Sequence, residues 1–463
     1  MAKTLTARRA ALFIGASILA LSLSAAPAMA GCNSGKVADT DLLASANCQA
    51  SAPGNNSVAV GRNAEANGNF ATALGGGVGS APAAVGNFST AIGNAATANA
   101  LGSVAIGNGL ATAANGQDSL AIMGATTAAA APNSIAIGKA ASVTGENSIA
   151  VGPNNTVTGN NSGAFGTNNT VNGDGSYAVG DPNVINGSNS FVFGDNNTIN
   201  GPNVAGNGDN VQVVGYNNTV ASTASANGSS VLGRFNTVNA LQGVAIGFGN
   251  TVTGNNGIAI GVSAQAVGVS TIAVGTSAGA GAAAANFSNI AIGEGAGRIV
   301  TGNFNQAVGV QAGVSVNGVQ NTATGSSAGT SVVGSFNTAT GTSAGNIVNG
   351  SGNTATGASA GTNVTGNSNT AAGAFAGSNV NGSSNTAYGD SAGQNVSGTG
   401  NTATGTDAGD NVNGLSNAAY GDSAGQNVTG NNNIAAGTDA GFGVIGSQNS
   451  AFGSSAGFNV TGD

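Results

Sequence analysis

The residue types that carry most enzymatic chemistry are scarce in this chain of 463 residues. It has no His and no Trp, only two Cys, and charged residues make up 5% of the sequence. Without His, neither a Ser/His/Asp nor a Cys/His arrangement can be assembled, and zinc ligands have no workable spacing. The many glycines recur periodically and do not form the strand-to-helix turn of a phosphate loop. The sequence therefore predicts a non-enzymatic protein with no cofactor, no metal and no small-molecule substrate.

Acidic side chains recur close behind a repeated glycine in the last part of the chain, at Asp390, Asp407, Asp422 and Asp439. These carboxylates could line one edge and hold a hard cation, or they could be solvated charges at corners. The G-G-x-G-x-D nonapeptide of calcium-binding β-rolls is absent, which favours solvated corners.

The elements that would position any surface are repeats, and the most regular ones fill residues 289–463. A 16-residue unit, N-x-A-x-G-x-x-A-G-x-x-V-x-G-x-x, recurs eleven times, and Asn opens each copy from Asn289 to Asn449. Strict periodicity of this kind is typical of a solenoid in which each unit stacks on the next. We therefore expect residues 289–463 to form a β-solenoid of eleven 16-residue coils.

One unit contains two short strands and two glycine corners, as in 337–341 and 347–350. A helix is disfavoured because its three glycines would each cost about 1 kcal/mol relative to Ala. The recurring Asn could form a side-chain amide ladder from coil to coil, or it could occupy a left-handed turn position. Both interpretations are compatible with the sequence.

Residues 55–288 carry a looser version of the same unit, mainly 14 residues long. Its strands end in a closing glycine, as in S-V-A-V-G (57–61) and S-I-A-I-G (134–138). The residue before this glycine is apolar, for example Val60, Ile106, Met123 and Ile137, and the residue before that is mostly Ala, as at Ala59, Ala105 and Ala136. A strand that is apolar on both faces is typically buried on both, which predicts an oligomer. Alternatively, the larger residues fill the coil and Ala forms a plain outer wall.

These units resemble the head repeat of trimeric autotransporter adhesins, the YadA-like family. The resemblance rests on N-S-V-A-V-G (56–61), N-S-I-A-I-G (133–138) and N-S-I-A-V-G (147–152), and it covers about residues 55–287. The 16-residue array resembles a cousin of this repeat. No heptads follow Asn289, so we expect head repeats without the stalk and membrane-anchor regions of the family.

The resemblance implies an all-β fold, a left-handed parallel β-roll of short 14- to 18-residue coils, arranged as a homotrimer. It also implies binding to extracellular matrix proteins such as collagen. The motif positions that become candidate ligand contacts are Asn56, Ser57, Asn133, Ser134, Asn147 and Ser148.

Residues 1–30 have the form of a secretory signal peptide, with Lys3, Arg8 and Arg9 before an apolar core and cleavage after Ala30. Its removal leaves five basic against sixteen acidic side chains, a net charge of −11, which argues against nucleic acid as a partner. Residues 31–54 then form an N-terminal cap. Cys32 and Cys48 would close a disulfide in an oxidising compartment, or Cys32 would be lipidated in a lipobox-like sequence.

Together these features predict an exported adhesin or structural protein of the bacterial cell surface, which presents a repetitive β-roll for multivalent attachment. An ice- or crystal-binding solenoid is the alternative, motivated by the T-x-T pairs 322/324, 338/340, 354/356 and 402/404. A phage-derived fibre module is a further alternative.

Overall fold

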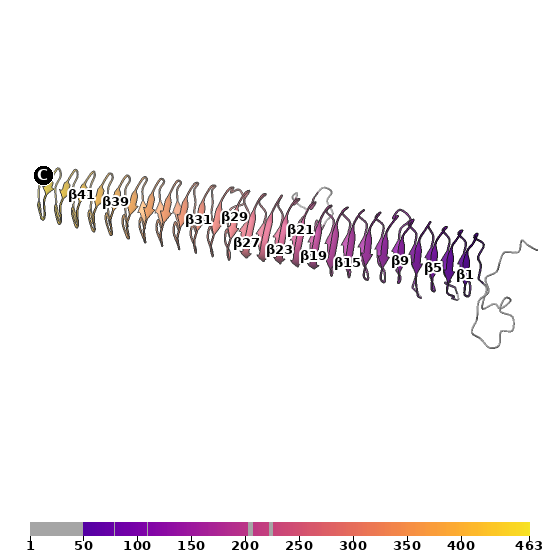
Figure 1. Ribbon diagram of the computed structural model, residues 1–463. Coiled ribbons are helices and arrows are strands. Elements are labelled where there is room, and N and C mark those ends of the chain that lie inside the picture. Colours follow the sequence, from indigo (N-terminus) through magenta and orange to yellow (C-terminus); the bar gives the residue numbers. More distant parts are fainter. Residues whose placement is uncertain (1–49, 78, 109, 202–206, 222–225) are drawn as a thin grey trace, which may run out of the picture. The chain divides into compact units, whose positions relative to one another are not determined.

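The computed structural model describes residues 50–77, 79–108, 110–201, 207–221 and 226–463 (Figure 1). The predicted signal peptide, its predicted cleavage site at Ala30 and the pair Cys32 and Cys48 lie outside these residues. The described part of the chain consists of strands and turns, and it contains no helix that could cross a membrane. The chain divides into two compact units, Met1–Ser188 and Asn189–Asp463.

The first unit is a parallel β-solenoid in which each coil contributes two strands. The strand that runs into the closing glycine is the leading strand, and the next one is the trailing strand. The leading strands are β1 (Val58–Val60), β3 (Thr72–Leu74), β5 (Thr90–Ile92), β7 (Val104–Ile106), β9 (Leu120–Ile122), β11 (Ile135–Ile137), β13 (Ile149–Val151), β15 (Gly163–Gly166) and β17 (Tyr177–Gly180). The trailing strands are β2 (Glu65–Ala66), β4 (Ala83–Ala84), β6 (Ala96–Ala98), β8 (Thr112–Ala114), β10 (Thr126–Thr127), β12 (Ser142–Val143), β14 (Thr156–Val157), β16 (Thr170–Val171) and β18 (Asn183–Ile185).

The second unit continues the same alternation and then simplifies it. Its leading strands are β19 (Phe191–Asp195), β21 (Gln212–Tyr216), β23 (Ser230–Arg234), β25 (Val244–Phe248), β27 (Ile258–Val262), β29 (Ile272–Val274), β30 (Ile290–Ile292), β31 (Gln306–Val308), β32 (Thr322–Thr324), β34 (Thr338–Thr340), β36 (Thr354–Thr356), β38 (Thr370–Ala372), β39 (Thr386–Tyr388), β40 (Thr402–Thr404), β41 (Ala418–Tyr420), β42 (Ile434–Ala436) and β43 (Ser450–Phe452). The trailing strands are β20 (Asn197–Ile199), β22 (Thr219–Val220), β24 (Thr237–Val238), β26 (Thr251–Val252), β28 (Gln265–Ala266), β33 (Val332–Val333), β35 (Val348–Asn349) and β37 (Val364–Thr365). Elsewhere after residue 289, single parallel bridges such as Asn381 to Ser397 replace the trailing strand.

Equivalent positions of successive coils face each other in register. Ala136 pairs with Ala150, 14 residues later, and Ala323 pairs with Ala339, 16 residues later. Each coil therefore completes the backbone hydrogen bonds of its neighbour, which a single coil could not do. The predicted all-β fold of stacked parallel coils is confirmed.

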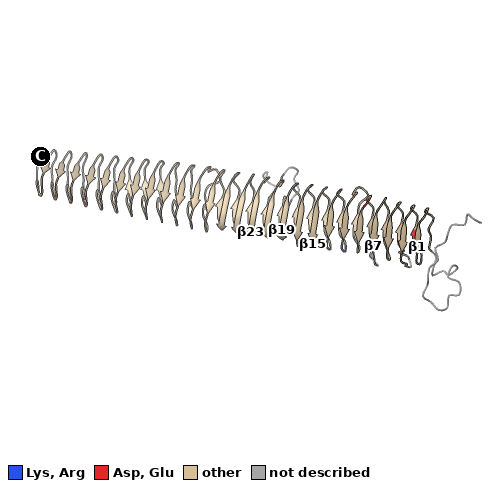
Figure 2. Cartoon of the chain, in the orientation of Figure 1, with Lys and Arg blue, Asp and Glu red and all other residues tan. Residues whose placement is uncertain are grey.

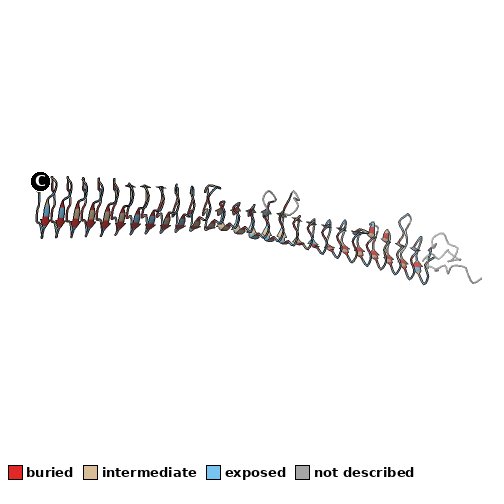
Figure 3. Ribbon diagram, turned by 90° about the horizontal axis from the view of Figure 1, so that it is seen from above, coloured by how far each residue is buried: buried red, intermediate tan, exposed pale blue. Residues whose placement is uncertain are grey.

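The core is a thin column of small side chains inside the coils. The buried positions recur from coil to coil along the ribbon (red in Figure 3). In the first unit the core is built from the Ala of each leading strand and from the inward residues of the trailing strands, which are mostly Ala up to β8 and Val or Ile from β12 on, such as Ala98 and Val157, with no exposed surface. In the 16-residue coils it is built from two Ala and one Val, for example Ala339, Ala344 and Val348. Only small residues fit because the two walls of a coil lie close together.

The closing glycine is required by both its conformation and its surroundings. Gly341 has φ of 127°, a value that L-residues rarely adopt. A Cβ atom at this position would lie 2.6 Å from the carbonyl oxygen of Gly357 in the next coil. The strict recurrence of glycine here therefore follows from the close stacking of the corners.

The recurring Asn of the 16-residue coils forms the predicted amide ladder. Asn337 is 5% exposed, and its Nδ2 donates to Asn321 Oδ1 at 3.0 Å and to the carbonyl oxygen of Gly350 at 2.9 Å. The left-handed turn position belongs to the residue before it, Phe336, with φ of 60°. Of the two interpretations of this Asn, the ladder is thus correct for the side chain, and the turn is displaced by one residue.

Candidate interaction surfaces

The outward side of the leading strands carries the large side chains. In β1, Ala59 has no exposed surface, whereas Val58 is 46% and Val60 38% exposed. Ile106 and Ile137 are partly exposed on the same side. The large residues thus face outward and Ala faces inward, so the alternative that the larger residues fill the coil is wrong.

The outward side chains form continuous apolar columns because the strands are in register. In the first unit, the third positions of the leading strands form one column: Val60, Leu74, Ile92, Ile106, Ile122, Ile137, Val151, Phe165 and Val179. One sequence assignment is corrected here. Met123, which directly precedes a closing glycine, lies in a turn with φ of 61°, and Ile122 occupies the column. An extra residue in that corner shifts the register by one.

The second unit has a wider apolar face at strands β19 to β27. Each of these strands runs past its closing glycine to a fifth residue, which adds a third outward column: Asp195, Tyr216, Arg234, Phe248 and Val262. The middle column includes Phe193, 54% exposed, and Leu232, 51% exposed. Sequence analysis missed this third column, although large residues directly after the closing glycine were the available signal.

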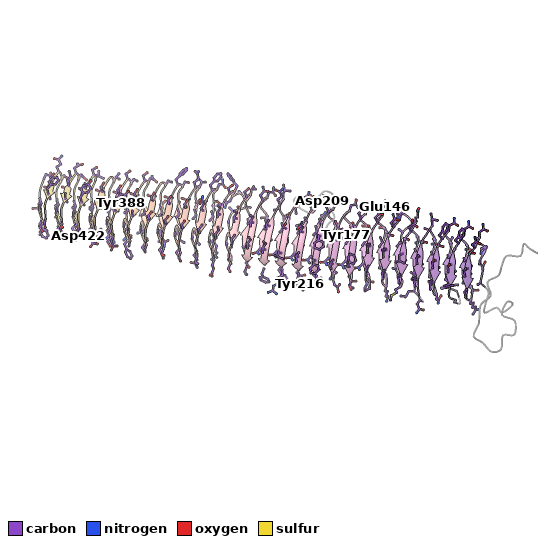
Figure 4. The ribbon with its side chains drawn as sticks, viewed as in Figure 1. Glu146, Tyr177, Asp209, Tyr216, Tyr388 and Asp422 are labelled. Carbon is purple, nitrogen blue, oxygen red and sulfur yellow. The ribbon has the colours of Figure 1, made fainter. Side chains whose placement is uncertain are left out.

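Aromatic contacts join this third column into a cluster (Tyr216 is labelled in Figure 4). The ring centroids of Tyr216 and Phe235 lie 5.6 Å apart, as do those of Phe235 and Phe248, both edge to face. The guanidinium carbon of Arg234 lies 5.1 Å from the centroid of the Phe248 ring. Such a cluster offers broad apolar contact area with little loss of side-chain entropy on binding.

Threonine replaces the apolar side chains in the outward columns of the 16-residue coils at strands β32 to β36. Thr322, Thr338 and Thr354 are paired in register, as are Thr324, Thr340 and Thr356. The second of these columns then contains Ala372, Tyr388 and Tyr420. Tyr388, labelled in Figure 4, is 48% exposed. This stretch therefore presents hydroxyl and methyl groups, with single aromatic side chains between them.

Three of the six predicted ligand positions are exposed Asn residues at turns. Asn56, Asn133 and Asn147 all have φ of 54°. The Nδ2 of Asn133 donates to Asn147 Oδ1 at 3.0 Å, and Asn147 donates to Asn161 at 3.3 Å. The structure therefore places these amides at the surface, where ligand binding by them remains a prediction.

The three predicted Ser positions are part of the corners. Ser134 and Ser148 are fully buried, and Ser57 is half-buried. The Oγ atom of Ser148 donates to the carbonyl oxygen of Gly159 at 2.8 Å, and Ser57 donates to Gly54 at 2.7 Å. These hydroxyl groups hold the turn before each leading strand.

Charged residues are sparse along the described strands (Figure 2). Asp390, Asp407, Asp422 and Asp439 lie at corners, and among the described residues no group of three or more ligand side chains could hold a metal ion. Burial raises the pKa of Asp410 from 3.8 to about 6, and nearby Asp407 contributes. A hydrogen bond of 2.9 Å from the Gln394 backbone nitrogen partly offsets this shift.

Stacked parallel coils with a repeated outward face define a β-solenoid repeat protein. Comparison with known families identifies the type of repeat. The YadA head domain repeat matches residues 52–77, 84–109, 129–155, 144–169 and 253–278. These parts of the chain are similar to the YadA head repeat, and the resemblance predicted from the N-S-I-A-V-G motifs is confirmed there. A comparison with curated proteins gives no match.

Proposed function

We propose that the protein is exported and acts at the bacterial cell surface as a homotrimeric adhesin or surface structure. Its repeats would attach to extracellular matrix proteins such as collagen, or to other surfaces. The observation that carries the proposal is the combination of adhesin-type head repeats with an outward column of apolar side chains that runs through every leading strand of the first unit.

Association of copies follows from the exposure of these columns. Burying a large apolar side chain contributes roughly 1.5–3 kcal/mol, and partly exposed ones contribute less. Association costs roughly 4–15 kcal/mol. The column that includes Val60, Ile106 and Ile137 repeats over every coil of the first unit, so its summed burial exceeds that cost.

The two repeat regions, 55–288 and 289–463, would have different roles, association of copies and binding of partners. The apolar columns of the first region would hold the copies together. The Thr columns at 322–356 would gain far less from burial, so the 16-residue coils would associate weakly and remain available to partners. Many equivalent weak sites along one particle would then bind by avidity.

Export would begin with cleavage after Ala30. The mature chain would start at Gly31 if Cys32 and Cys48 form a disulfide, or at Cys32 if that residue is lipidated. Mass spectrometry of the N-terminal peptide distinguishes the two, and an intact Met1 on protein recovered outside the cell would contradict export.

Binding of the full chain to immobilised collagen, fibronectin and laminin tests adhesion directly. The wild-type chain should bind at least one matrix protein, with a much slower dissociation when several copies are clustered. A chain with Asn133→Ala and Asn147→Ala would test the predicted ligand positions. Its matched control is Asn154→Ala, an exposed turn residue with φ of 58° outside those positions. No binding to any matrix surface would refute adhesion to host matrix.

One observation favours ice or crystal binding as a second candidate. The pairs Thr322/Thr324, Thr338/Thr340 and Thr354/Thr356 face outward in register and form a small regular grid. The grid ends where Ala372 and Tyr388 replace Thr, and an extended lattice match would not tolerate such changes. A measurement of thermal hysteresis distinguishes ice binding from adhesion, because an adhesin should show no thermal hysteresis.

A further inference from the structure

The trailing side of the 16-residue coils carries a column of exposed Asn residues. Its members share the same coil position, an exposed side chain and φ between 54° and 57°: Asn363, Asn379, Asn395, Asn411, Asn427 and Asn459. Neighbouring amides form a surface ladder, in which Asn363 Nδ2 donates to Asn379 Oδ1 at 3.0 Å and Asn395 Nδ2 to Asn411 Oδ1 at 3.0 Å. The five side chains from Asn363 to Asn427 thus have closely matched surroundings, whereas Gly443 separates Asn459 from them.

The residue that lies two positions after each Asn divides this column into a group of four and a group of two. Asn363, Asn395, Asn427 and Asn459 are followed by Thr365, Ser397, Thr429 and Thr461. Asn379 and Asn411 are followed by Asn381 and Asn413 instead. The four therefore form N-x-S/T sequences, the acceptor sequence for N-linked glycosylation, and the two do not.

The fold places the amide and the hydroxyl of these sequences on the same exposed side. The Val between them points into the core: Val364 is 3% and Val396 4% exposed. The residues on either side of this Val both face solvent, with Asn363 and Asn395 at turn positions of left-handed φ. Thr365 and Ser397 are exposed accordingly.

Two N-x-S/T sequences at corners within residues 55–288 lack this accessibility. In 160–162, the hydroxyl of Ser162 is buried and donates to the carbonyl oxygen of Gly173 at 2.9 Å. In 227–229, the hydroxyl of Ser229 is buried and donates to Ala240 at 2.9 Å. An enzyme that must contact both the amide and the hydroxyl could reach them in the 16-residue coils but not at these corners.

We propose that Asn363, Asn395, Asn427 and Asn459 are acceptors for N-linked glycosylation. The Nδ2 atom would bond to the anomeric carbon of a sugar activated by a phosphate leaving group. The bond between that carbon and the phosphate oxygen breaks, the phosphate group leaves with the electron pair, and Nδ2 gives up one proton to the solvent. An amide nitrogen carries two hydrogens, and the ladder uses only one of them at Asn363 and Asn395. The sugar would replace the other, so the ladder is retained.

The resulting pattern would be one sugar on every second coil at 363, 395 and 427, spaced about 9.5 Å apart at 4.7–4.9 Å per stacked strand. This spacing leaves room for a carbohydrate on each site without crowding. The proposal concerns modification of the trailing side and does not depend on what the protein adheres to.

The test is peptide mass spectrometry of the full chain purified from the cells that naturally produce it. No Lys or Arg follows Arg298, so cleavage at Asp is used. It places Asn395 and Asn411 on separate peptides, bounded by Asp390, Asp407, Asp410 and Asp422. Sugar masses should appear on the Asn395 peptide and not on the Asn411 peptide. Fragmentation should likewise locate sugar on Asn363 and not on Asn379.

Two substitutions at exposed positions should exchange the modification states of Asn395 and Asn411. Ser397→Ala should abolish modification of Asn395, and Asn413→Ser should create it at Asn411. Both changes lie on the solvent side of the coil, so folding is maintained. Unmodified peptides at all four positions would overturn the proposal. Equal modification of Asn395 and Asn411, or modification unaffected by Ser397→Ala, would also overturn it.

Discussion

Replacing one member of the buried Asn ladder tests whether side-chain amides hold the 16-residue coils together. Asn337→Ala removes four hydrogen bonds. Two are donated by Asn337 Nδ2, to Asn321 and Gly350, and two are accepted by its Oδ1, from the backbone and side chain of Asn353. Each is worth roughly 0.5–1.5 kcal/mol, and buried groups left without partners raise the cost. We expect a local destabilisation of about 4 kcal/mol.

The assay is amide hydrogen exchange of the full chain, because stacked repeats need not unfold in one step. A loss of about 4 kcal/mol corresponds to roughly a thousandfold faster exchange in the coils around residue 337. Thr338→Ala is the matched control, since its side chain is exposed on the next residue of the same coil. It should change exchange by about twofold at most. Equal effects of the two substitutions would refute the role of the ladder.

Three further substitutions probe the corner, the core and the acidic edge. Gly341→Ala should cost at least about 2 kcal/mol in unfolding free energy, because its Cβ would meet the Gly357 carbonyl at a φ of 127°; hydrogen exchange at that corner measures it. Ala136→Leu should cost about 1–3 kcal/mol by overpacking, whereas outward Ile137→Leu should be nearly neutral in a urea titration. The raised pKa of Asp410, about 6 against 3.8 unfolded, means that the folded state binds more protons between these values. Its contribution to stability therefore falls as pH rises from about 4 to about 6, and Asp410→Asn should flatten the pH dependence of local exchange in that range.

Much of the fold could be predicted because the repeats encode their own geometry. Glycine recurs where φ is positive and the next coil is close, as at Gly341, and Ala recurs where the coil is narrow, as at Ala59. A closing glycine alone does not fix the register of its strand, and this explains why Met123 was wrongly assigned to the apolar column. There the corner contains an additional residue, and only strand pairing shows that Ile122 continues the column.

The roles of individual Asn residues were harder to predict because one residue type occupies several environments. In the doublet Asn154 and Asn155, the first is an exposed turn residue with φ of 58°, and the second is fully buried. Asn155 starts a second internal ladder, in which Asn169 Nδ2 donates to its Oδ1 at 3.2 Å and Asn183 donates to Asn169. Neither composition nor spacing distinguishes the two members of such a doublet, because only the stacked structure shows which amide faces inward.

The central claim, that the outward apolar columns join copies of this chain, is tested most directly by the mass of the full chain in solution. Sedimentation equilibrium should give three times the chain mass for the wild type. The triple variant Ile106→Thr, Ile122→Thr and Ile137→Thr carries at these positions the residue that the 16-residue coils use, and it should dissociate at concentrations where the wild type does not. Thr324→Ala, Thr340→Ala and Thr356→Ala together form the matched control and should leave the mass unchanged. A monomeric wild type, or a triple Ile variant that associates as tightly as the wild type, would contradict the account.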